Sequence, residues 1–227
     1  TELSDQISIS LSTILPATLC ISMFTSGSTG TPKKVSRTLA QLMAEITVLE
    51  SVFHETVKDT AVYSSVSHQH AYGILFYILW PLCAGRIISV PMLDYPEQIE
   101  AAILHEPAIT LISSPALLKR MHIEPIASRK LTVFSAGGLL ETAAAEQVLV
   151  SLKAYPNEIL GSTETGAVAH RQQLRNTNWW PLPEVTLSLD PATQCLKVCS
   201  DFFEHNNGFV MGDNITFNTD GTFALHG

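Results

Sequence analysis

Short runs of β-branched and other apolar residues alternate with longer helical patterns up to about Gly166, and turn residues separate them. Six runs are predicted to be strands, at residues 19–24, 61–65, 86–90, 109–113, 131–134 and 158–160. Five segments between them have the apolar spacing of helices, at residues 36–53, 72–82, 96–105, 115–122 and 141–152. Because this alternation is typical of β-α-β units, we expect an α/β fold with a mostly parallel sheet and flanking helices.

The texture of the sequence changes after Gly166, where prolines become frequent and the apolar runs become shorter. Five short alternating segments follow, at residues 185–189, 196–200, 209–211, 215–218 and 222–225. The dipeptides Asn207-Gly208 and Asp220-Gly221 are turn signals beside such segments. We therefore expect an α/β subdomain over residues 1–175 and a small antiparallel β subdomain over residues 176–227.

Composition argues against several classes of protein. Hydrophobic residues make up 46% of the 227-residue chain and charged residues 15%, which is typical of a globular protein with one good-sized core. A formal net charge of −8 argues against nucleic acid as the main partner, because phosphate backbones are held by clustered Lys and Arg. The longest strongly apolar run, residues 74–84, is shorter than the ~20 residues of a membrane-spanning helix. With no secretory signal visible, we expect a cytoplasmic protein.

Four cysteines, Cys20, Cys83, Cys195 and Cys199, lie in apolar or strand-like contexts. Cys195 and Cys199 are close in sequence, but no other Cys or His pair lies near enough to indicate a zinc site. We expect reduced and buried thiols, as in cytosolic proteins.

A glycine-rich loop lies between the first predicted strand and the first predicted helix, with the sequence Thr25-Ser26-Gly27-Ser28-Thr29-Gly30-Thr31-Pro32-Lys33. Glycine lets backbone N–H groups close around phosphate oxygens, and the Ser and Thr hydroxyls add donors. Lys33 can place a positive charge near the outer phosphates. The loop fits neither the Walker A pattern, nor the G-x-G-x-x-G fingerprint, nor the G-x-S-x-G nucleophile elbow. A flexible polar loop is the alternative interpretation.

The order of these nine residues resembles the phosphate loop of the adenylate-forming superfamily, which includes acyl-CoA synthetases, luciferases and the adenylation domains of peptide synthetases. The resemblance implies the large domain of an AMP-dependent ligase of the acyl-CoA synthetase type, with residues 1–175 binding nucleotide and acyl group. The implied ATP contacts in the loop are Thr25, Ser26, Gly27, Ser28, Thr29, Gly30 and Lys33.

Three further segments resemble the family's nucleotide contacts, in the same order along the chain. Gly137-Gly138 resembles the turn against which the adenine ring lies, since glycine after a strand lets a flat base approach the backbone. Gly161-Ser162-Thr163-Glu164 resembles the G-x-T-E segment, whose Thr contacts the α-phosphate and whose Glu holds Mg²⁺, a cation that prefers carboxylate and phosphate oxygens. Gly212-Asp213 resembles the step whose Asp accepts hydrogen bonds from both ribose hydroxyls. Alone each segment is weak evidence, and the shared order gives them weight.

A fourth segment concerns the acid substrate. The run His68-Gln69-His70-Ala71-Tyr72-Gly73 resembles a segment of acyl and aryl ligases in which His70 lines the carboxylate pocket. Amino-acid-activating domains usually carry an Asp in this region, and none is present between Asp59 and Asp94. A fatty or aryl acid is therefore favoured over an amino acid. Half of a metal site at His68 and His70 is the alternative, although the sequence indicates no third ligand.

The resemblance implies a reaction in two steps. A carboxylate attacks the α-phosphorus of ATP, pyrophosphate leaves, and the resulting acyl-adenylate passes its acyl group to a thiol. That thiol belongs to coenzyme A or to the phosphopantetheine arm of an acyl carrier protein. The implied catalytic residues are Thr163, Glu164 and His70, and Glu164 is also the implied ligand of Mg²⁺.

The family's pattern extends beyond both ends of this chain. Family members have a large N-terminal part before the phosphate loop. They also have a C-terminal domain with a catalytic Lys after an interdomain hinge, and residues 220–227 resemble the segment just before that hinge. We therefore expect a fragment that is poorly active alone. The competing hypotheses are a non-catalytic module that binds nucleotide or acyl-adenylate, and a P-loop phosphoryl-transfer enzyme, which the absent Walker A sequence disfavours.

Overall fold

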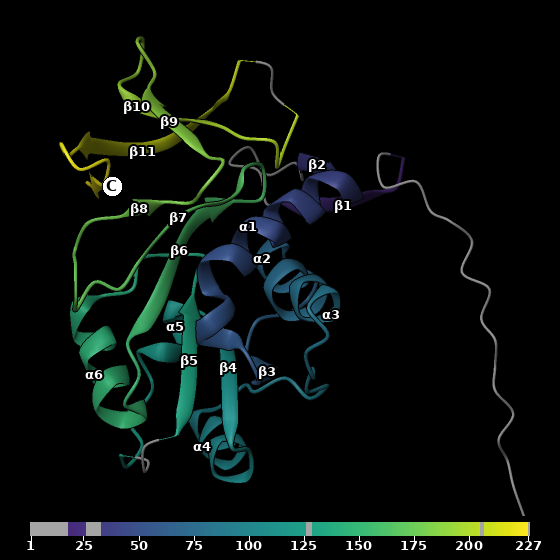
Figure 1. Cartoon of the computed structure of the whole chain (residues 1–227). Coiled ribbons are helices and arrows are strands. Elements are labelled where there is room, and N and C mark those ends of the chain that lie inside the picture. Colours follow the sequence, from purple (N-terminus) through teal and green to yellow (C-terminus); the bar gives the residue numbers. More distant parts are fainter. Residues whose placement is uncertain (1–17, 26–32, 126–128, 205–206, 227) are drawn as a thin grey trace, which may run out of the picture.

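A six-stranded sheet, in the order β3-β4-β5-β6-β7-β8, is the centre of the computed structural model, which describes residues 18–25, 33–125, 129–204 and 207–226 (Figure 1). The parallel strands are β3 (Ala61–Ser64), β4 (Ala108–Ser113), β5 (Lys130–Ser135) and β6 (Pro156–Ser162). An antiparallel edge, absent from the predicted strands, follows as β7 (Gly166–Arg171) and β8 (Trp180–Pro181). The expected α/β fold with a mostly parallel sheet is confirmed.

Helices cover both faces of this sheet, and the central strands supply apolar residues to each face. Leu111 and Val133 pack in one cluster with α4 (Pro96–His105), α5 (Pro115–Leu118) and α6 (Thr142–Leu152). Their neighbours Ile112 and Phe134 pack in the other cluster, with α1 (Leu39–Val57) and the helical run of residues 71–83. Burial on both faces explains why these strands are continuous apolar runs in the sequence.

The first two strands form a separate antiparallel pair, β1 (Cys20–Thr25) with β2 (Lys33–Thr38), and the glycine-rich loop lies between them in sequence. A helix starting at residue 36 is therefore a wrong prediction, since α1 begins at Leu39. The Thr38 hydroxyl accepts from the Gln41 N–H at 3.2 Å, and the Gln41 side chain accepts from the Thr38 N–H at 2.8 Å. This capping box starts the helix after Thr38.

The helix predicted over residues 72–82 is present, but its middle is wider than an α-helix. It consists of α2 (Ala71–Gly73), the π-helical η1 (Ile74–Leu79) and α3 (Trp80–Cys83). The Trp80 N–H donates to the Leu75 carbonyl, five residues earlier. Pro81 has no N–H and its ring would clash with the carbonyl four residues back in an α-helix, which accounts for the wider turn just before it.

Two other predicted elements are shorter than expected. Residues 86–90 make one isolated bridge, Ile88 with Val62, in place of a strand. The Tyr77 hydroxyl donates to the Ser89 and Val90 carbonyls at 2.5 and 3.2 Å, so this segment is held against the helix as well as the sheet. The helix predicted over residues 115–122 ends at Leu118, and separate turns follow it.

The chain ends in a four-stranded antiparallel sheet, in the order β12-β11-β10-β9. The strands are β9 (Thr186–Leu189), β10 (Cys195–Cys199), β11 (Phe209–Phe217) and β12 (Phe223–Leu225). The two strands predicted at 209–211 and 215–218 are therefore one. A register shift opposite residues 195–197 lets β11 pass through Gly212, Asp213 and Asn214, which are weak strand formers.

The expectation of buried thiols is wrong for Cys20 and Cys83, which are exposed, while Cys195 and Cys199 are partly exposed. Cys20 lies on the separate hairpin and Cys83 ends α3, so neither points into a core cluster. All four are free thiols. Within the described ranges, no helix is both long and apolar enough to cross a membrane.

The cap at Thr38 is open to a direct test. We expect Thr38→Ala to lower the free energy of unfolding by about 1 kcal/mol, because the Gln41 N–H loses its acceptor. Urea unfolding measures the change. Thr47→Ala on the exposed side of α1 is the matched control, since its hydroxyl only donates back to the Met43 carbonyl and its loss should cost nothing. Equal losses in both variants would contradict the assignment of the cap.

Candidate functional site

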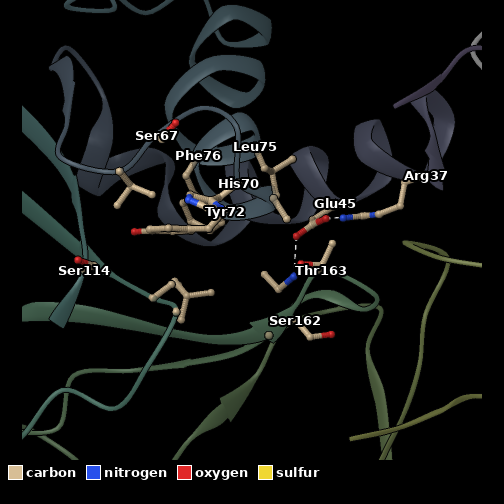
Figure 2. A pocket seen from close by; sticks show the side chains of 18 of the residues that line it. Arg37, Glu45, Ser67, His70, Tyr72, Leu75, Phe76, Ser114, Ser162 and Thr163 are labelled. Atoms are coloured by element: carbon tan, nitrogen blue, oxygen red, sulfur yellow. Dashed lines mark hydrogen bonds and ion pairs between the residues drawn. The ribbon is translucent and has the colours of Figure 1, made fainter. Parts of the chain in front are cut away.

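A cavity of about 540 Å³ opens at the carboxyl ends of the parallel strands (Figure 2). Its wall includes Ser65 after β3, Ser114 after β4, Gly137 after β5 and Gly161 near the end of β6. Ligands of open α/β sheets bind at this edge, because the loops that leave the strands converge there. The cavity is therefore the first candidate for a binding site.

Four of the residues predicted from the sequence line this cavity, namely His70, Gly137, Gly161 and Thr163. Gly138 is exposed next to Gly137 and does not line the wall. Asp213 lies half-buried on β11 in the four-stranded sheet and is also outside the lining, so its ribose contact stays a prediction. The loop residues Ser26, Gly27, Ser28, Thr29 and Gly30 lie outside the described residues.

The two described ends of the glycine-rich loop face each other across the hairpin. Thr25 and Lys33 are register partners, and the Thr25 hydroxyl lies 3.5 Å from the Lys33 carbonyl oxygen. Beyond the hairpin, the Lys33 ammonium donates to Glu164 Oε1 at 3.0 Å, across 131 positions of sequence. Folding thus places the end of the loop against the Gly161–Glu164 segment.

Glu164 is adapted to its ion pair. Burial acts to raise the pKa of its carboxyl, but the hydrogen bond and the charge of Lys33, together with hydrogen bonds from the Glu164 N–H and the Ser162 side chain, outweigh burial and hold the pKa below its usual value. Glu164 is therefore an anion at neutral pH, and Lys33, with 57% of its side chain exposed, can leave it for another anion. A carboxylate of this kind is a suitable ligand for a hard divalent cation.

The turn that carries Thr163 and Glu164 is closed by its own side chains. The Ser162 hydroxyl accepts from the Thr165 N–H at 3.1 Å, and the Thr165 hydroxyl accepts from the Ser162 N–H at 3.1 Å. A Cβ on Gly161 would lie 2.2 Å from the Gly166 carbonyl oxygen, so the backbone can close only with glycine at that position. Thr163 is held at the cavity wall as a result.

Two lining residues were missed by sequence reasoning, Arg37 of β2 and Glu45 of α1. Arg37 Nη2 donates to Glu45 Oε2 at 2.5 Å, and both side chains are buried (Figure 2). Burial raises the pKa of Glu45, and the Arg37 charge with the Ala167 N–H only partly offsets that effect. The sequence does hold a signal, since Glu45 stands on the apolar face of α1 between Leu42 and Leu49.

The cavity wall near His70 is largely apolar, with Leu75, Phe76 and Ile159 in the lining. His70 is the exposed residue before α2, and Figure 2 shows it beside Tyr72. The Tyr72 hydroxyl is buried without a hydrogen-bond partner in the described structure. Burial raises the pKa of Tyr72 well above its usual value, so the phenol stays protonated at neutral pH.

The residues present fit a nucleotide with a hard divalent cation. Gly137 has a φ of +83°, and a Cβ built there would meet nothing within 4 Å, so the backbone faces open space where a flat ring could lie. No group of three His, Cys, Asp or Glu side chains gathers as a metal site among the described residues. A cation at Glu164 would therefore need phosphate oxygens as further ligands, and the hypothesis of a metal at His68 and His70 gains no third ligand.

A second cavity of about 510 Å³ lies at the other end of α1 and is lined by Phe53, Lys153, His170 and Arg175 among others. None of the residues predicted from the sequence lines it. We therefore take the first cavity as the candidate site.

Comparison with known proteins bears on both the sequence and the fold. The sequence profile of the family described as AMP-binding enzymes matches residues 5–197. A search of curated protein sequences gives no significant match.

Solved structures share the fold. A double mutant of o-succinylbenzoate CoA synthetase (MenE) from Bacillus subtilis, bound with its product analogue OSB-NCoA, has a TM-score of 0.77 at 15% identity, over 90% of this chain and 48% of its own. The same enzyme in complex with ATP and magnesium ion has a TM-score of 0.76 at 14% identity, over 90% and 49%. A malonyl-CoA ligase with methylmalonyl-CoA and AMP bound has a TM-score of 0.75 at 19% identity, over 91% and 52%. This chain spans about half the length of each.

The pairing of Lys33 with Glu164 leads to a prediction about ionisation. In Lys33→Met the hydrogen bond and the charge of Lys33 disappear, while burial and the hydrogen bonds from the Glu164 N–H and the Ser162 side chain remain, so the pKa of Glu164 should rise. In the unchanged chain the ion pair stabilises the fold above the usual pKa of a glutamate, and this contribution disappears as the pH falls through the lowered pKa.

Carboxyl NMR titration of Glu164 measures the shift. Lys34→Met, on the same exposed strand but without a hydrogen bond to Glu164, removes the same charge and serves as the control. An equal rise in both variants would show that the Lys33 contact has no specific effect.

Proposed function

This chain belongs to the AMP-binding enzyme family, and on that premise we propose that the complete protein uses ATP to activate a carboxylic acid as an acyl-adenylate. The observation that supports this proposal most directly is the contact of 3.0 Å between Lys33 and Glu164. The contact brings the described end of the glycine-rich loop to a carboxylate that is chemically suited to Mg²⁺, beside the cavity that Thr163 lines.

In this proposal the glycine-rich loop and the Gly161–Gly166 turn both bind the phosphates of ATP. An incoming triphosphate competes with Glu164 for Lys33, so the Lys33 ammonium moves to the phosphate and frees the Glu164 carboxylate. Glu164 would be the protein ligand of Mg²⁺, and the cation would neutralise phosphate charge when bound. The Thr163 hydroxyl donates to the α-phosphate, where negative charge develops as the acid attacks.

The other proposed nucleotide contacts lie at or beside the cavity and on the four-stranded sheet. Gly137 and Gly138 offer the backbone surface for adenine, and Asp213 accepts from the ribose hydroxyls. Thr25 and the loop residues through Gly30 bind the outer phosphates, with Gly161 giving the turn its close approach. These roles are our proposal, and the residues present are chemically suited to them.

For the acid, we propose a fatty or aryl carboxylate without an amino group. His70 is an exposed polar residue of the lining, and Leu75, Phe76 and Ile159 supply apolar wall for the acyl chain or ring. Glu45 is an acid in the wall, but its charge is already matched by Arg37. No free carboxylate in the described lining could therefore pair with a substrate ammonium.

We propose a thiol as the final acyl acceptor, in coenzyme A or the phosphopantetheine arm of an acyl carrier protein. The structures of similar fold are CoA synthetases and ligases, which supports coenzyme A as the first acceptor to examine. An acyl-adenylate is a reactive mixed anhydride, and a thiol that enters the same cavity would attack its acyl carbon, form a thioester and release AMP.

The test is a pyrophosphate-release screen of the complete protein against aliphatic and aryl acids. We expect Glu164→Gln to lower the rate by ~10²-fold or more, because a neutral amide oxygen binds the cation much more weakly than a carboxylate. Glu146→Gln, an exposed residue of α6, is the matched control and should keep full activity.

Pyrophosphate release with none of the acids, combined with retained nucleotide binding, would favour a non-catalytic binding module. Full activity of Glu164→Gln would contradict the metal role of that residue.

A further inference from the structure

The buried ion pair of Arg37 and Glu45 joins two consecutive elements, and each partner also contacts a segment far away in the sequence. Arg37 is on β2, the strand that continues from the glycine-rich loop, and Glu45 is on α1. Their side chains are 3% and 0% exposed, and the atoms Nη2 and Oε2 lie 2.5 Å apart. A pair so deeply buried holds β2 to α1 in one geometry.

The second oxygen of Glu45 fixes the turn that carries Thr163 and Glu164. Glu45 Oε1 accepts from the Ala167 N–H at 2.6 Å, just after that turn. Gly166 has a φ of +69°, and a Cβ there would lie 2.5 Å from Glu45 Oε2. The backbone at Gly166 therefore approaches the carboxylate so closely that any side chain would displace it.

Arg37 extends the junction to the four-stranded sheet. Its Nε donates to the Phe202 carbonyl oxygen at 2.9 Å. Phe202 lies between β10 and β11, and β11 carries Asp213. One ion pair thus links three segments. Arg37 belongs to β2, the strand after the glycine-rich loop; Glu45 holds the Ala167 N–H after the turn with Thr163; and Arg37 holds Phe202 in the connection that leads to Asp213.

Stability alone does not explain this pair. Removing two charges from water is expensive, and well-packed apolar residues can often replace a buried pair without loss of stability. The pair also lies in the wall of the candidate site. There the free-energy cost of burying two charges can be offset by a more precise arrangement of the binding residues.

We propose that Arg37 and Glu45 are positioning residues that set the spacing of the three segments around the bound nucleotide. They act on the phosphates and ribose through β2, the Gly161–Gly166 turn and β11, without a reacting atom of their own. The identity of the ligand rests on the proposed function, but the coupling of the three segments rests on the hydrogen bonds alone.

Two independent changes test the junction. The double variant Arg37→Met/Glu45→Met replaces both charges with apolar side chains of similar length, so that neither partner is left buried and unpaired. Gly166→Ala leaves both charged residues in place but displaces the carboxylate. Its matched control is Gly85→Ala, at a φ of +67°, where an added Cβ meets nothing within 4 Å and only the backbone strain is shared.

The first measurement is hydrogen exchange in this chain. We expect the amides of residues 161–167 to exchange at least ~10-fold faster in the double variant and in Gly166→Ala, because the Ala167 N–H loses its acceptor. Gly85→Ala should leave that segment unchanged. Wild-type exchange in both test variants would overturn the proposal, whatever the protein's activity.

The second measurement is pyrophosphate release by the complete protein, with the KM for ATP and the KM for the acid determined separately. We expect the KM for ATP to rise at least ~10-fold in both test variants, and the KM for the acid to stay within about twofold. A merely structural pair predicts that the folded double variant has the wild-type KM for ATP, which would overturn the positioning role. A wild-type protein without activity would refute the proposed function, and the exchange result would still decide the junction.

Discussion

The carboxylate of Glu45 accepts from Arg37 at 2.5 Å and from the Ala167 N–H at 2.6 Å, and much of the site is built around these two contacts. Its helix also supplies Leu42 and Leu49 to the core, so the packing of α1 determines where the carboxylate lies. A buried charge is tolerated only when its hydrogen bonds are satisfied. The backbone of β7 and the side chain of Arg37 must therefore meet it in one arrangement.

The parallel sheet supplies the second constraint. Strands β3 to β6 run in the same direction, so the segments after them meet at one edge although they are far apart in sequence. His70, Gly137 and Thr163 come to one cavity for this reason. After the Gly161–Gly166 turn, the antiparallel β7 brings the Ala167 N–H to Glu45. Lys33 of the β1–β2 hairpin contacts Glu164 of the same turn.

Local patterns predicted most of the elements, and their failures have local causes. The apolar runs of β4 and β5 and the bounds of α4 were readable because periodicity depends on near neighbours. The start of α1 was misplaced because Thr38 can end a strand and cap a helix at once. Residues 86–90 have the composition of a strand, but the Tyr77 hydroxyl binds their carbonyls from another element. No local pattern encodes such a partner.

The sequence by itself determined the family, the α/β class and the order of the segments that we propose bind nucleotide, because ordered motifs such as 25–33 and 161–164 are properties of the chain alone. It also indicated His70, Thr163 and Glu164 as one set. Only the tertiary structure decided that Lys33 pairs with Glu164 and that Arg37 and Glu45 join three segments. Such contacts depend on how helices pack on a sheet, since a distance between residues remote in sequence is set by the whole core.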